Sequence, residues 1–136
     1  MKIAATFMPK KWDEKTYGQT SPRTKLTRTT AEFQYSGQIQ GEGGVEYLMF
    51  YSSFDEQDPH KATAEYVGLV NFKGTIDGKS GSCVFEERGA FESAEAKSSL
   101  RILPGSGTGQ LSGISGTGSS VATPKTCHME FDYRLP

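Results

Sequence analysis

The chain has 136 residues, a formal net charge of −1 and 23% charged residues. This length suits one hydrophobic core, so residues 1–136 are expected to form a single domain. A charge so close to zero favours neither nucleic acid nor an anionic membrane surface as a partner. The 35% hydrophobic content and 16 glycines are more typical of an antiparallel sheet, in which alternate side chains face water, than of a helical protein.

The N-terminus and the cysteines indicate a compartment. The first residues, MKIAATFMPKKWDEK, contain only a short apolar run before Pro9 and two lysines. This run is too short for a secretory signal or a transmembrane span. Cys83 and Cys127 lie in strand-like runs among apolar neighbours, and we predict that both are buried, reduced thiols. These features predict a cytoplasmic protein.

The first third of the chain is predicted to form three strands. Residues 3–12 form a first strand that is interrupted or bent at Pro9. In residues 26–40, apolar or threonine side chains alternate with polar or charged ones, and this alternation predicts a long second strand. We place a turn at GEGG (41–44) and a third strand over 45–51.

A hairpin is predicted in the middle of the chain. It follows the segment SSFDEQDPHKA (52–62), which has the composition of an exposed loop. Two alternating runs, 63–76 and 79–91, are joined by Asp77-Gly78. Asp-Gly is a strong hairpin signal because a type I′ turn needs positive φ at both positions.

The C-terminal third begins with a predicted strand over 97–103 that ends at Pro104. The segment PGSGTGQLSGISGTG (104–118) follows, and we interpret it as turns, bulges and close backbone contacts at a barrel corner. One or two helical turns could lie near 108–115. A closing strand is predicted over 126–135.

The parity of these strands places large side chains on one face and acids on the other. The shared face carries Phe33, Tyr35, Tyr47, Met49, Tyr66, Val70, Phe72, Cys83, Phe85, Met129, Phe131 and Tyr133. The opposite face carries Glu32, Glu46, Glu65, Glu86, Glu130 and Asp132. A curved sheet with an aromatic inner face hides its edges most simply by closing, so we predict an all-β fold, a single antiparallel closed barrel.

Four apolar side chains break this parity. Leu48, Phe50, Val67 and Leu69 fall on the outer face. Because a monomer rarely exposes a large apolar patch, we predict a homodimer in which two copies bury it. The alternative is that residues 13–25 fold back over the patch.

No motif in the chain identifies a catalytic residue, a cofactor site or a metal site. Residues 74–80, GTIDGKS, are one residue short of a phosphate-binding loop and lie in a hairpin. His60 lies in a polar loop without the context of a catalytic base. His128, Glu130 and Asp132 share one strand face and could form part of a metal site, although a solvated outer face explains them more simply.

The chain resembles a family of small bacterial proteins, domains of unknown function whose fold is similar to the allene oxide cyclase barrel. The resemblance covers nearly the whole chain and is carried by WDEKTY (12–17), KLTR (25–28), GEGGVEYLMFY (41–51), YVGLVNFKGTIDGKSGSCVFEERGAF (66–91) and LPGSGTGQLSGISGTG (103–118). It implies an eight-stranded, allene oxide cyclase-like, calycin-like antiparallel barrel. It implies no reaction, because no catalytic residue of the plant cyclases can be matched here.

Three functions remain open at this point. The first is a module that binds a small hydrophobic or amphipathic molecule inside the barrel. The second is a cofactor-free isomerase or cyclase acting by shape, with Tyr47, Tyr66 or Tyr133 as its polar group. The third is a structural barrel filled by its own side chains. The residues expected to line a pocket are Tyr47, Met49, Tyr66, Phe72, Phe85, Phe131 and Tyr133.

Overall fold

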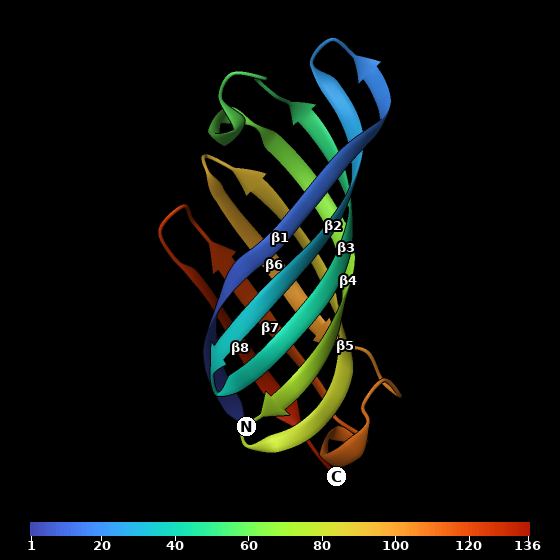
Figure 1. Ribbon diagram of the computed structural model, residues 1–136, viewed down its shortest axis with the longest axis vertical. Coiled ribbons are helices and arrows are strands. Elements are labelled where there is room, and N and C mark those ends of the chain that lie inside the picture. The colour runs from blue at the N-terminus through green and yellow to red at the C-terminus, as the bar shows by residue number, and fades with distance from the viewer.

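The computed structural model describes residues 1–136 as eight antiparallel strands that close into a barrel in sequence order (Figure 1). Each strand pairs with the next, and β8 pairs with β1 to close the ring. Two short 3₁₀ helices lie in the connections. The elements are β1 (Lys2–Ser21), β2 (Thr24–Gly37), β3 (Ile39–Ser53), η1 (Pro59–Lys61), β4 (Thr63–Ile76), β5 (Lys79–Glu92), β6 (Glu95–Ile102), η2 (Gly109–Leu111), β7 (Ser115–Ala122) and β8 (Cys127–Arg134). The predicted all-β closed antiparallel barrel is confirmed.

Both chain termini lie at the same end of the barrel (Figure 1). Side chains of the hydrophobic core fill this half of the interior. Every side chain predicted to share the inner face is buried. The Phe85 ring stacks on Phe72 at a centroid distance of 5.5 Å and lies 5.0 Å from the Phe131 ring. Leu111 and Ile114, from the glycine-rich connection between β6 and β7, are also buried and close this end of the core. Period-two alternation therefore predicted the core residues correctly.

The outer face of the barrel carries the ion pairs. Arg28 pairs with Glu46 at 2.9 Å, and Arg101 pairs with Glu86 at 3.3 Å. These side chains are more than one-third exposed, so the pairs contribute little to stability. No helix of the chain has the length and apolar composition needed to cross a membrane.

The turn expected at GEGG (41–44) is wrong, because these residues lie inside β3. The chain turns instead at Gly37, which has φ +103, and Gln38. A Cβ atom on Gly41 would lie 2.3 Å from the carbonyl oxygen of Lys73 on the neighbouring strand. Glycine is needed here because β3 and β4 approach each other closely, and not because the chain reverses.

Two further differences concern strand length. The first strand does not end near Trp12 but continues to Ser21, and the irregularity at Pro9 is a shift in its register with β2. Proline cannot donate to the ladder, so a bulge accommodates it without breaking the strand. The strand β7 was not predicted. Its glycines face large neighbours, and a Cβ on Gly118 would lie 2.8 Å from the Phe131 ring.

The hairpin prediction is confirmed, whereas the prediction of two buried cysteines is correct for Cys83 and wrong for Cys127. Asp77 and Gly78 have φ of 53° and 81°, as a type I′ turn requires. Both cysteines are free thiols. Cys83 is buried, whereas Cys127 is only partly buried because it lies where the barrel opens.

Candidate functional site

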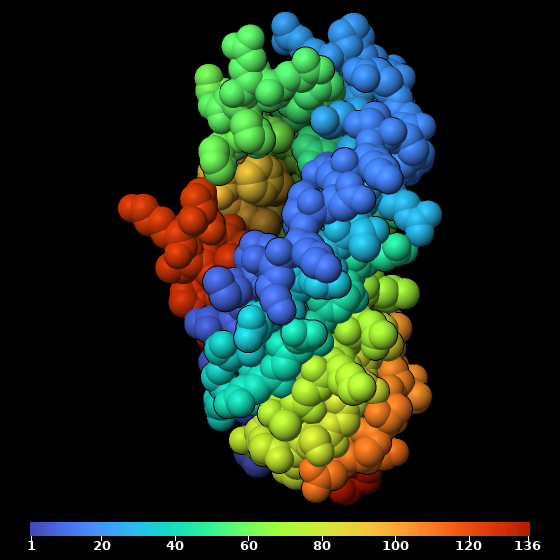
Figure 2. Space-filling view, viewed as in Figure 1, coloured from blue at the N-terminus to red at the C-terminus, as the bar shows by residue number.

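A cavity of about 750 Å³ occupies the half of the barrel away from the termini. β1 pairs with β8 only as far as Thr6 and His128, and beyond that point the two strands diverge. Figure 2 shows a hollow between the β1 side, in blue, and the β7–β8 end, in red. The segment 54–62 and the β7–β8 turn residues Thr123 and Pro124 contribute to the rim. The cavity therefore opens both at the end and at the side of the barrel.

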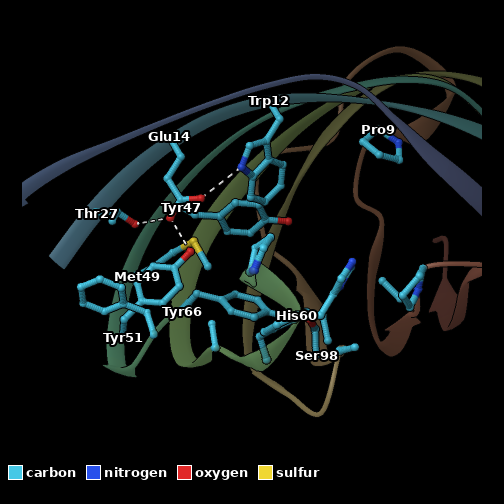
Figure 3. A pocket seen from close by; sticks show the side chains of 18 of the residues that line it. Pro9, Trp12, Glu14, Thr27, Tyr47, Met49, Tyr51, His60, Tyr66 and Ser98 are labelled. Carbon is cyan, nitrogen blue, oxygen red and sulfur yellow. Dashed lines mark hydrogen bonds between the residues drawn. The ribbon is translucent and has the colours of Figure 1, made fainter. Parts of the chain in front are cut away.

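The cavity exists because small side chains face large ones across it. On β6 and β7 the inner positions are held by Ala96, Ser98, Ser120 and Ala122. The opposing wall carries aromatic side chains and Met49 from β1, β3 and β4 (Figure 3). Alanine and serine cannot fill the barrel radius that the phenylalanines fill in the other half, so an open space remains.

The side chains expected to line a pocket divide between the two halves. Tyr47, Met49 and Tyr66 line the cavity. The other expected residues do not, because they pack in the filled half: Phe72, Phe85, Phe131 and Tyr133. The Tyr133 hydroxyl donates a hydrogen bond to Asp77 at 2.7 Å and so fastens the β4–β5 turn to β8.

Glu87, on β5, forms the central polar group of the cavity wall. The Tyr47 hydroxyl donates to its Oε1 at 2.7 Å, and the Ser98 hydroxyl donates to its Oε2 at 2.7 Å. Ser98 also shares a hydrogen bond with the hydroxyl of Tyr66. Four strands thus contribute to one network of a carboxyl group and three hydroxyl groups.

Two glycines make room for this network. A Cβ on Gly68 would lie 2.5 Å from the Tyr47 ring, and a Cβ on Gly89 would lie 2.7 Å from the Tyr66 hydroxyl. Gly68 lies two residues after Tyr66 on β4, and Gly89 lies two residues after Glu87 on β5, so both glycines occupy inward positions. Any side chain there would displace a tyrosine, so the two glycines allow both rings to reach the carboxyl region.

Burial determines the protonation of this network. It raises the pKa of Glu87 above its ordinary value of 4.5, while the hydrogen bonds from Tyr47 and Ser98 act in the opposite direction. Burial, followed by the nearby charge of Glu87, raises the pKa of Tyr47 well above 10. Burial also raises the pKa of Tyr66, to about 12. Both tyrosines are therefore neutral hydrogen-bond donors at neutral pH.

A second carboxylate, Glu14, lies on the β1 side of the cavity (Figure 3). It accepts hydrogen bonds from the Trp12 indole at 3.1 Å, from the Thr27 hydroxyl at 2.9 Å and from the Tyr51 hydroxyl. Trp12 and Glu14 face the cavity because the bulge after Pro9 reverses the inward parity of β1. This carboxylate accepts hydrogen bonds from donors on three strands, β1, β2 and β3.

Neither Glu14 nor Glu87 was predicted to line the cavity, for different reasons. Glu87 has the same parity as Cys83 and Phe85, so the alternation that assigned those residues to the interior could also have found it. No sequence signal places Glu14 inside, since the parity change depends on where β1 and β2 change register.

The other candidate groups do not form a site. The structure contains no cluster of three or more His, Cys, Asp and Glu side chains arranged to hold a metal ion. His128, Glu130 and Asp132 are exposed on the outside of β8, and Asp132 pairs with the N-terminal amine at 3.0 Å. His60 lies in η1 at the rim of the cavity. The glycine-rich 104–114 segment caps the filled end, as a structural element.

Comparison with other proteins agrees with this architecture. A crystal structure of a protein of unknown function from the DUF3224 family of Shewanella oneidensis MR-1, at 1.84 Å, superposes with a TM-score of 0.75 and 19% identity over 100% of this chain and 97% of that chain. A likeness at this identity shows a shared fold. A search among curated proteins finds no match. The family described as "protein of unknown function (DUF3224)" matches residues 3–133, and the chain therefore belongs to the DUF3224 family.

Proposed function

We propose that the protein binds a small, mostly apolar molecule in the open half of its barrel, as a calycin-like barrel would. The observation that carries this proposal is the cavity of about 750 Å³, which lies within the range of ligand pockets. Its wall combines aromatic rings with a few polar groups fixed by hydrogen bonds, which is the composition of small-molecule sites. A cavity of this size argues against a barrel filled by its own side chains. The two free thiols support a cytoplasmic location.

Filling the cavity tests the proposal. Ser120 faces the cavity, whereas Ser119, its neighbour on β7, faces outward. We expect one neutral naphthalene dye to bind per wild-type chain, with quenching of the fluorescence of Trp12, the one tryptophan of the chain. Ser120→Phe should abolish binding and Ser119→Phe should retain it. Absence of dye binding to the wild type, or equal binding by both variants, would contradict the proposal.

A cofactor-free isomerase is the second candidate, and Glu87 is the observation that favours it. A carboxyl group with a raised pKa beside two tyrosine hydroxyls in a cavity is a suitable group for proton transfer. Small molecules extracted from protein incubated in D₂O distinguish the two functions. An isomerase that moves a carbon-bound proton through Glu87 would introduce deuterium into the molecule, and Glu87→Gln would prevent it. A carrier would leave the molecule unlabelled.

We also propose that two copies associate through the outer face of β2, β3 and β4. Leu48 and Leu69 are 51% and 52% exposed there, and the segment 13–25 does not cover them because it pairs edge to edge within the barrel. Glu65 and Arg88 border this patch and form no ion pair within the chain. In a two-fold interface the Arg88 of one copy can pair with the Glu65 of the other, which favours a second copy as the occupant.

A further inference from the structure

We infer that the cavity selects a ligand that carries a protonated amine, with the amine held by Glu87 and the apolar body against the rings of Trp12, Tyr47 and Tyr66. This inference rests on the proposed binding function and names the chemical class of the ligand.

The cavity wall is acidic, although the whole chain is almost neutral. Its lining includes the carboxylates Glu14, Asp55, Glu56 and Glu87, and its one lysine is Lys25. The Lys25 ammonium is engaged at the rim, where it lies over the rings of Tyr51 and Phe54 at 4.9 and 4.3 Å. Glu14 and Glu87 lie in the wall, whereas Asp55 and Glu56 are exposed at the rim, and this excess of negative charge attracts a cation and repels a carboxylate such as that of a fatty acid.

Glu87 has no positive partner in the protein. The groups that bond to it, the hydroxyls of Tyr47 and Ser98, are neutral. The adjacent Glu86 faces outward and forms an ion pair with Arg101. The other ion pairs of the chain also lie between exposed groups on the outside of the barrel. A carboxylate offers about four acceptor sites, so Glu87 can accept further N–H donors from a ligand.

Glu14 is less suitable for this role. Its two oxygens already accept three hydrogen bonds, from Trp12, Thr27 and Tyr51. These donors fix the carboxylate against the β1–β2 wall and leave it less capacity for a ligand. The preference for an amine is therefore assigned to Glu87.

Aromatic rings surround the space next to Glu87. The Tyr47 ring lies 5.4 Å from the Tyr66 ring in an edge-to-face arrangement and 6.1 Å from the Trp12 ring (Figure 3). The faces of such rings attract ammonium groups, most strongly where water is excluded. A cation bound here would contact both a carboxylate and aromatic faces. No positively charged side chain of the protein forms an ion pair with Glu87 at this position.

The test compares three ligands that share one naphthylethyl body and end in an amine, a hydroxyl or a carboxylate. Calorimetric titration of the wild type should give an affinity for the amine about tenfold higher than for the alcohol, because an ammonium donor adds its own positive charge to the hydrogen bond with the Glu87 carboxylate. The carboxylate should bind most weakly. Glu87→Gln should lose the preference for the amine, so that the amine and the alcohol bind to this variant with similar affinity. Glu86→Gln is the matched control and should keep it.

The pH dependence gives a second readout. Amine binding to the wild type should weaken as the pH falls through the raised pKa of Glu87, and alcohol binding should stay constant. If the alcohol binds but the amine has no advantage, or if Glu87→Gln keeps the advantage, the assignment of the ligand class is overturned while the binding function stands. If none of the three ligands binds, both are overturned.

Discussion

Replacing Gly78 with valine isolates the effect of backbone conformation at the β4–β5 turn. Gly78 has φ +81, in the left-handed region, and a Cβ atom built on it would meet no other atom within 4 Å. The substitution therefore introduces no steric clash with neighbouring residues. An L-residue in this conformation costs about 1–2 kcal/mol, and a β-branched residue lies at the upper end of that range.

This free energy converts into a measurable melting shift. An unfolding entropy of about 2 cal/mol/K per residue predicts that Gly78→Val lowers the Tm by about 3–7 °C. Gly44→Val is the matched control, because Gly44 lies exposed in β3, also has open space around it and has no positive φ. Valine favours strands, so the control should melt at or above the wild-type temperature. Thermal melts followed by circular dichroism measure both variants.

Two results would refute this reasoning. If Gly78→Val melts at the wild-type temperature, the type I′ geometry does not constrain the turn. If Gly44→Val is destabilised as much as Gly78→Val, the loss comes from replacing any glycine in this sheet and not from the left-handed conformation.

Three further predictions concern pH, thiol reactivity and assembly. Because the pKa of Glu87 is raised in the fold, the unfolding free energy should fall as the pH rises from 4.5 through that higher value, and Glu87→Gln should lack this decrease. Denaturant titrations that give the same pH dependence of the unfolding free energy for both proteins would contradict this prediction. Burial raises the pKa of Cys83 to about 12, so this thiol should resist alkylation until the protein unfolds, whereas Cys127 should react in the native state and be protected by a cavity ligand. Mass spectrometry measures the labelling of each thiol, and fast labelling of Cys83 in the native protein would count against its assignment to the core. Sedimentation should show a wild-type dimer that Leu48→Lys with Leu69→Lys converts to monomer, and a wild type that is monomeric at micromolar concentration would exclude the interface.

The inward face of the barrel could be predicted from the sequence because it depends on one local rule. In an extended chain the side chains alternate, so Phe85 and Cys83 must share a face wherever the strand lies. Asp77-Gly78 is local in the same way, since the conformations of these two residues define the turn. Such features need no knowledge of neighbouring strands.

Features that depend on contact between strands could not be predicted. GEGG has the composition of a turn, yet Gly41 is required where the β4 backbone approaches β3. The reversal of parity after Pro9, which turns Trp12 and Glu14 toward the cavity, arises from the pairing of β1 with β2. The division of the interior into a filled and an open half arises from the small side chains of β6 and β7, which face aromatic residues far away in the sequence.

The network around Glu87 is difficult to explain as a device for stability. A half-buried carboxyl group without a positive partner destabilises a fold, because its desolvation penalises the charged form. A glutamine could accept from the Tyr47 hydroxyl and donate to Ser98 without that penalty. Position 68 also lacks a packed side chain, because any Cβ there would clash with the Tyr47 ring that reaches the carboxyl group. A costly acid, held in a defined orientation at the wall of an open cavity, is the arrangement expected where a bound molecule supplies the missing positive charge.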